Sequence, residues 1–146
     1  MLRGNALAKV DAKGRLKLPS AYRTIIEPNY GREFFVTSLR GESVRVYPMD
    51  VWTAIEAKMA QVSSLNPAMN RLKKRVHYFG QPATMDKQGR LLIHPLLRER
   101  ADVKGEVAVL GQLDFLEVWN RAAFEQGLVS DPLTDDDLAE LSTLGI

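Results

Sequence analysis

The chain has 146 residues, of which 45% are hydrophobic and 26% charged, with no cysteine and a net charge of +2. This composition can bury one compact core, and it excludes disorder along the whole chain, disulfides and thiolate metal sites. The longest apolar runs fall far short of a membrane span or a signal sequence, so we expect a cytoplasmic protein with no membrane partner.

The first half of the chain alternates strand and helix patterns. Residues 15–18, RLKL, alternate charged and apolar side chains, which predicts a half-buried strand. Runs rich in β-branched and aromatic residues predict further strands at 33–39 and 43–48. Helices are predicted at 19–26, at 51–62 after a cap at Asp50, and from Pro67 to Phe79 after the break at 63–67.

The second half repeats the first. Residues 8–23 align with 83–98 at six of 16 positions, and the likeness resumes where 44–52 meets 116–124. The six matched pairs are Ala8 with Ala83, Asp11 with Asp86, Gly14 with Gly89, Arg15 with Arg90, Leu16 with Leu91 and Arg23 with Arg98. This self-similarity predicts an internal repeat in which each unit holds a hairpin, a short helix, two more strands and a helix.

In this second unit, strands are predicted at 106–111 and 115–119 and a short helix at 95–101. Thr134 is predicted to cap an acidic helix that starts with three aspartates. Four short strands cannot bury their own apolar face, so the second repeat is the expected partner of the first. We expect a mainly β fold with short helices (α+β), with one barrel built from both halves. Its parts are a first repeat (1–50), connecting helices (51–80), a second repeat (81–125) and an acidic C-terminal tail and helix (126–146).

The two repeats share the turn motif D-x-x-x-R. In each, the aspartate can accept hydrogen bonds from backbone N–H groups two residues on, and glycine can adopt the positive φ that closes the turn. The motif residues are Asp11, Gly14 and Arg15, then Asp86, Gly89 and Arg90. The aspartate and arginine lie on one face across the turn, near enough to form an ion pair. That pair can be purely structural, or it can hold an arginine ready for a ligand.

The neighbours of the first turn favour a ligand. Lys9, Lys13, Arg15 and Lys17 would line one outer face and the tip of the hairpin, with Arg3 close by in sequence. A β-ribbon fits the major groove of DNA, and such cations suit phosphates or guanine edges. The second hairpin offers only Lys87 and Arg90, so we expect it to make the weaker contact.

Charge is distributed unevenly along the chain. Residues 1–80 hold 14 Lys and Arg against 6 Asp and Glu, a net charge of +8, and residues 81–146 hold 6 against 12, a net charge of −6. This split favours either a polyanionic partner for the first half or head-to-tail attraction between subunits.

The helix expected at 67–79 carries the basic run 71–75, which can bind phosphates or lie beside a subunit interface. It also carries an apolar stripe that either caps the barrel of its own chain or contacts a second subunit. The stripe residues are Met69, Leu72, Val76 and Phe79.

Together these segments resemble the MraZ family of bacterial transcriptional regulators, which consists of two SpoVT–AbrB domains in tandem. The resemblance rests on RGN at 3–5, VDAKGRLKLPSAYR at 10–23, LNPAMNRLKKRVHYFG at 65–80 and MDKQGRLLIHPLLR at 85–98, and it reaches to about residue 125. It implies a barrel of interlocked, swapped hairpins, a ring-shaped homo-oligomer, and binding to direct DNA repeats upstream of the cell division and cell wall operon. The family motif falls on Asp11, Arg15, Asp86 and Arg90; one departure is His94, where members often have proline.

Other chemistry finds little support in the sequence. His77 and His94 lie in no metal-ligand spacing, and no nucleotide-binding or hydrolase motif occurs, so we expect no metal, cofactor, small-molecule substrate or catalysis. Trp52 and Trp119 are expected in the core rather than as base-stacking platforms. The resulting hypothesis is a nucleoid-associated, sequence-specific DNA-binding repressor. Its rivals are an AbrB-like antitoxin or oligomeric protein-binding scaffold, and a hydrolase using Asp11 or Asp86 with a histidine.

Overall fold

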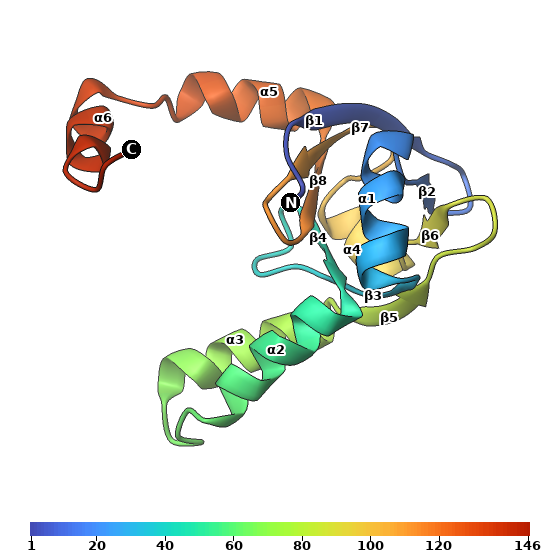
Figure 1. Ribbon diagram of the computed structural model, residues 1–146, viewed down its shortest axis with the longest axis horizontal. Helices are drawn as coiled ribbons and strands as arrows, with labels where there is room; N and C mark the ends of the chain where they lie inside the picture. The colour runs from blue at the N-terminus through green and yellow to red at the C-terminus, as the bar shows by residue number, and fades with distance from the viewer.

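The computed structural model describes all residues, 1–146, and its centre is one eight-stranded antiparallel sheet that curls into a nearly closed barrel (Figure 1). The first half supplies β1 (Asn5–Val10), β2 (Arg15–Lys17), α1 (Ser20–Tyr30), β3 (Glu33–Thr37), β4 (Val44–Pro48) and α2 (Met49–Ala60). The connecting helix α3 (Pro67–Tyr78) follows. The second half supplies β5 (Gln81–Thr84), β6 (Arg90–Leu92), α4 (Pro95–Arg100), β7 (Gly105–Gly111), β8 (Leu116–Asn120), α5 (Arg121–Ser130) and α6 (Asp135–Ser142).

The two halves interlock strand by strand. The order across the sheet is β5-β3-β4-β8-β7-β1-β2-β6. Strand β1 pairs with β7, β2 with β6, β3 with β5 and β4 with β8, so each of these four ladders joins the two repeats. The edge strands β5 and β6 are consecutive in the chain, which brings the two ends of the sheet together. The expected mainly β fold, with interlocked hairpins in one barrel, is confirmed.

Equivalent residues of the two repeats meet in the core. A cluster of 21 buried residues fills the barrel, and strand alternation directs these side chains inward from both halves. Leu16 faces Leu91 across the β2–β6 ladder, and neither side chain is exposed to solvent. Removing either half would expose this shared core, which is why the barrel needs both repeats.

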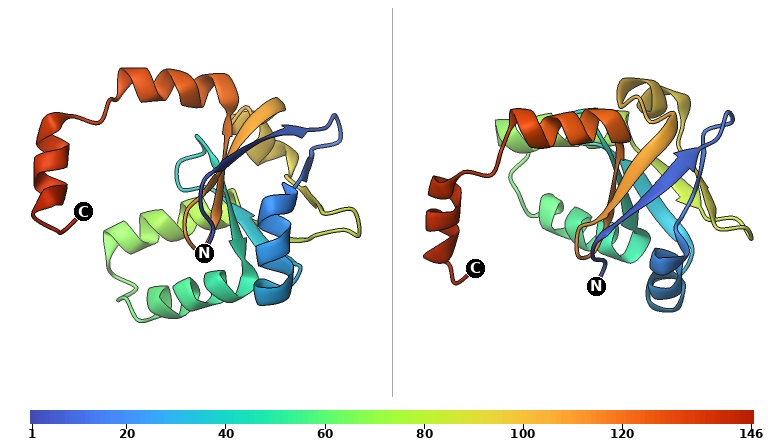
Figure 2. Two further views of the ribbon diagram at one scale, coloured as in Figure 1. Left: turned by 45° about the horizontal axis from the view of Figure 1, so that its top comes forward. Right: turned by 90° about the horizontal axis from the view of Figure 1, so that it is seen from above.

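Helices α2 and α3 leave the barrel together and rest on a second apolar cluster (Figures 1 and 2). Trp52 of α2 stacks on Phe35 of β3 at 4.6 Å between ring centroids, and Val76 of α3 is buried beside them. The expected helices are present, but Asp50 is not the cap of α2: that helix begins at Met49 directly after Pro48, and Asp50 lies in its first turn. Helix α1 also continues past the predicted end, through Pro28.

The C-terminal part forms an arm of two helices. Helix α5 packs against β7 and β8, whereas α6 stands away from the barrel (Figures 1 and 2). As predicted, Thr134 caps α6 in a reciprocal arrangement with Asp137. No helix is long and apolar enough to cross a lipid bilayer.

Candidate nucleic-acid interface

The turn between β1 and β2 is built around the carboxylate of Asp11. One oxygen, Oδ1, accepts hydrogen bonds from the backbone N–H of Lys13 (3.0 Å) and of Arg15 (2.9 Å). The other, Oδ2, accepts one from Nε of Arg15 at 2.8 Å. Gly14 has a φ of +82°, which allows the chain to reverse without the strain that a side chain would bring.

The second hairpin reproduces this geometry. Asp86 accepts hydrogen bonds from the backbone N–H of Gln88 (2.9 Å) and of Arg90 (2.8 Å), and from Nε of Arg90 (2.8 Å). Gly89 has a φ of +77°. The predicted ion pairs are therefore both present, and in each the guanidinium group uses only Nε, so its two terminal nitrogens have no hydrogen-bond partner in the chain.

Both aspartates stay ionised well into the acid range. The backbone N–H of Arg15 is the main reason that the pKa of Asp11 lies below its ordinary value of 3.8, and the guanidinium of Arg15 lowers it further. The backbone N–H of Arg90 lowers the pKa of Asp86 in the same way. At neutral pH each arginine is thus held by a full negative charge.

The two motifs lie on one continuous surface. In the β2–β6 ladder, Lys17 is the partner of Arg90, and Arg15 is the partner of Leu92. Because Leu16 and Leu91 point into the core, their neighbours point outward. Backbone hydrogen bonds of 2.9 Å from Leu18 to Gly89 and from Ile93 to Gly14 fasten each turn to the other hairpin.

The remaining predicted cations divide into two groups. Lys13 and Lys87 are exposed at the two tips, and Lys9 shares a concavity of about 510 Å³ with Lys17 and Arg23. We call the face formed by these side chains the hairpin face; its predicted residues are Lys9, Lys13, Arg15, Lys17, Lys87 and Arg90.

Arg3 does not join this face. It lies beside the β7–β8 connection, where Leu2 bridges to Leu113, at the far end of β1 from the turn. Arg3 lies eight positions before Asp11, roughly 27 Å of extended chain. The strand separates in space what is close in sequence.

Two arginines next to the turns were not singled out as site residues from the sequence. The side chain of Arg98 in α4 lies over Gly14, and that of Arg23 in α1 lies over Gly89. A Cβ atom at Gly14 would come within 1.4 Å of Nη1 of Arg98. Each hairpin is therefore flanked by an arginine from the other repeat, and the signal for both was present as a matched pair of the internal repeat.

These two arginines differ in their partners. Arg23 forms an ion pair with Glu27 at 3.2 Å, whereas Arg98 forms none. Arg98 instead lines a concavity of about 320 Å³ together with Asp11 and Lys104. The first hairpin thus gains an unpaired cation from the second repeat.

The apolar stripe predicted on α3 is split between the interior and the surface. Val76 and Phe79 are 1% and 5% exposed and pack within their own chain, so the part that a second subunit could reach is Met69 and Leu72, which are half-buried.

The side chain of His94 has a structural role, because its Nε2 forms a hydrogen bond of 2.7 Å with the backbone carbonyl of Phe79. No cluster of three or more potential metal ligands occurs.

Comparisons with known proteins agree on one family. The family described as "MraZ protein, putative antitoxin-like" matches residues 1–75 and 81–137. The chain is 43% identical over 146 residues to "Transcriptional regulator MraZ" of Acidobacterium capsulatum and 45% identical over 147 residues to that of Koribacter versatilis, each covered over its full length, as is this chain. A protein of the same name from Escherichia coli O9:H4 is 33% identical over 96% of this chain and 95% of its own length.

Proposed function

Because the chain belongs to the MraZ family, we propose that it is a transcriptional regulator that binds double-stranded DNA with its hairpin face. The observation that carries this proposal is the pair of oriented guanidinium groups. Arg15 and Arg90 are each fixed through Nε by an aspartate, with two terminal nitrogens left for a ligand. A guanidinium held in this way can donate to O6 and N7 of guanine or to two phosphate oxygens.

The rest of the face supports a polyanion rather than a small anion. Lys17 lies beside Arg90, and Lys13 and Lys87 stand at the tips, so the cations spread over two hairpins instead of converging on one pocket. A ribbon of two strands has the width to enter a major groove, while flanking lysines contact the phosphates that fix its register.

The proposal extends to assembly and to the target. We propose that the protein forms a ring and represses transcription by occupying direct repeats upstream of the cell division and cell wall operon. In this role it would be a cytoplasmic protein associated with the nucleoid. Copies in a ring present their hairpin faces in the same sense at regular spacing, which suits direct repeats better than a palindrome. Binding of the first repeat raises the effective concentration at the second, so two repeats hold the assembly far more tightly than one.

Fluorescence anisotropy with labelled duplexes tests the proposal. The three probes are the region upstream of the operon with its repeats intact, the same region with one repeat left, and a scrambled duplex of equal length. The proposal predicts the tightest binding to intact repeats, at least a tenfold loss with one repeat, and weak, strongly salt-dependent binding to the scrambled duplex. Equal affinity for all three, or none for any, would instead support the antitoxin or protein-scaffold function.

A further inference from the structure

The C-terminal arm, residues 121–146, ends in a helix that its own chain leaves uncovered. Helix α5 is tied to the barrel by its contacts with β7 and β8 and by an ion pair of 3.7 Å between Arg121 and Glu106. Helix α6 follows after residues 131–134, and every residue of it is exposed except Leu141, which is half-buried. Figures 1 and 2 show it standing clear of the barrel from each side.

Helix α6 is amphipathic, and all of its charged residues are acidic. Leu138 and Leu141, three residues apart, share one side of the helix, and Leu138 is 50% exposed. Residues 122–146 contain no lysine or arginine, and no salt bridge uses the four carboxylates of α6, which are Asp135, Asp136, Asp137 and Glu140. Six of the thirteen exposed large hydrophobic side chains of the molecule lie in residues 128–146. A helix that exposes a leucine beside unpaired carboxylates is suited to a basic, partly apolar surface.

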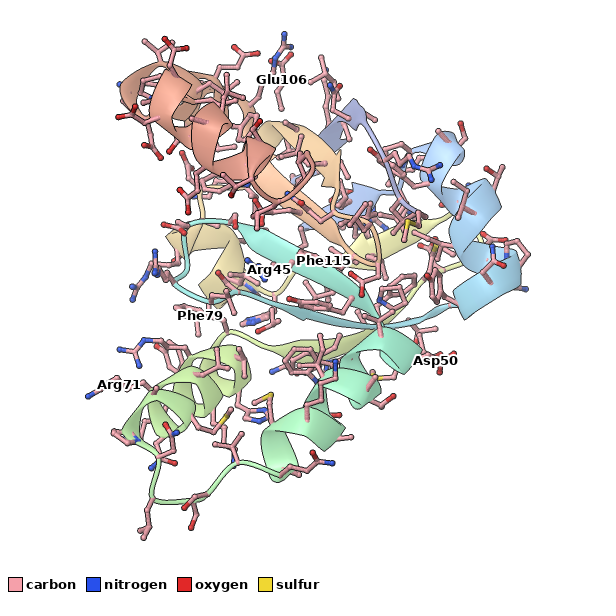
Figure 3. All side chains as sticks on the ribbon, turned by 60° about the vertical axis from the view of Figure 1, so that its left-hand side comes forward. Arg45, Asp50, Arg71, Phe79, Glu106 and Phe115 are labelled. Atoms are coloured by element: carbon pink, nitrogen blue, oxygen red, sulfur yellow. The ribbon has the colours of Figure 1, made fainter.

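Helix α3 has the complementary surface. No acidic residue occurs between Glu56 and Asp86, and none of the cations of α3 takes part in a salt bridge. These cations are Arg71, Lys73, Lys74 and Arg75. Figure 3 shows Arg71 projecting outward from the helix. Met69 and Leu72 pack partly against the apolar cluster of their own chain, and their remaining exposed part adds the apolar component of the surface.

We propose that α6 of one protomer docks on α3 of a second copy, with its carboxylates against the free cations and its leucines against Met69 and Leu72. The inference rests on the proposed oligomer and names the surfaces that would join its subunits. Each copy carries one donor helix and one acceptor helix, so the contact is head to tail, and in the proposed ring it would recur at every interface.

The positions of the helices favour a second copy over the alternatives. Helix α6 and the two hairpin turns lie on opposite sides of the barrel, so α6 does not reach the hairpin face of its own chain (Figures 1 and 2). Figure 1 also shows helices α6 and α3 of one chain standing apart. A neighbouring copy placed head to tail would cover α6 of one chain with α3 of the next, so both surfaces would be buried.

Two charge-reversed variants test the contact. The donor variant carries Asp135→Lys, Asp136→Lys and Glu140→Lys and keeps Asp137, which forms the capping box with Thr134. The acceptor variant carries Arg71→Glu, Lys74→Glu and Arg75→Glu, all at exposed positions of α3. Neither set touches the core, so circular dichroism and melting of the barrel should match the wild type.

Analytical ultracentrifugation without DNA then gives the mass of each variant. Either variant alone should need on the order of tenfold more protein to assemble, because attraction becomes repulsion at three sites. An equimolar mixture should regain the wild-type mass, since each reversed donor then meets a reversed acceptor. A charge-matched control with Glu42→Lys, Glu99→Lys and Asp114→Lys, exposed acids outside any salt bridge, should assemble normally.

The proposal is overturned if either variant alone keeps the wild-type mass. It is also overturned if the mixture stays small while a chain carrying all six substitutions assembles, because that result would place the contact within one chain. A donor variant of unchanged mass that binds DNA more tightly would show that α6 competes with DNA, and it would overturn the proposal too. Failure of wild-type protein to bind any duplex would contradict the proposed function and leave the mixing result standing.

Discussion

Replacement of Arg15 by alanine should separate binding from stability. In the folded chain Arg15 and Asp11 form one ion pair, at 2.8 Å, between side chains that are 33% and 40% exposed. An exposed pair of this kind stabilises the fold by about 0–1 kcal/mol. For a chain of 146 residues the entropy of unfolding is about 0.3 kcal/mol per degree, so the melting temperature should fall by no more than about 3 °C.

The effect on DNA binding should be much larger. Loss of one arginine contact to a base or phosphate costs about 1–3 kcal/mol, roughly a 5- to 150-fold weaker affinity for each hairpin face engaged. Where Arg15 contacts a phosphate, the log–log salt slope should also fall by about 0.9 for each face. Fluorescence anisotropy at several salt concentrations, with calorimetric melting of the same samples, measures both quantities.

Arg40→Ala provides the matched control. Arg40 is exposed in the β3–β4 connection, forms no salt bridge, and lies outside the hairpin face. Its removal takes away the same charge and should change affinity by less than about twofold. If Arg15→Ala binds DNA like the wild type, or if Arg40→Ala binds as weakly as Arg15→Ala, the oriented guanidinium is not the contact.

Three further outcomes are expected. Gly14→Ala and Gly4→Ala should lower the melting temperature by similar amounts in thermal melts, because both positions have a positive φ and the end of the flexible Arg98 side chain, which a Cβ at position 14 would meet, can move aside. Because the pKa of Asp11 is lowered in the fold, its support of the turn is fully present above the ordinary pKa of 3.8 and is lost only as pH falls through the lower pKa of the folded chain. Anisotropy should therefore show constant affinity from about pH 7 to 5 and a fall only below about pH 4. Leu72→Asp should give folded but smaller assemblies in light scattering, and an unchanged mass would show that this half-buried side chain serves only its own chain.

Much of the fold follows from local pattern. Alternation in residues 15–18 and the aromatic runs at 33–39 and 43–48 indicate strands because each strand buries one face, and that requirement is written in consecutive residues. The D-x-x-x-R turn is equally local, since Asp11 bonds to atoms no more than four residues away. The internal repeat then indicates that two such units share one core.

The contacts between the two repeats could not be predicted from the sequence, because they depend on how the two units interlock. The proximity of Lys17 to Arg90 follows from the register of the β2–β6 ladder, and neither hairpin specifies that register alone. The position of the Arg98 side chain over Gly14 also depends on how the two repeats pair. Asp50 was wrongly assigned as a cap because a good capping residue one position inside a helix looks the same in sequence as one at its start.

The most direct test of DNA binding by the hairpin face uses the absence of cysteine in the chain. Ala12→Cys, at the exposed tip of the first hairpin, would carry a tethered reagent that cleaves DNA, and Ser64→Cys, in the connection between α2 and α3, would carry it as a control. We expect cuts from position 12 inside each direct repeat, at a regular spacing, and none from position 64. Cuts from position 64 with none from position 12 would contradict DNA binding by the hairpin face.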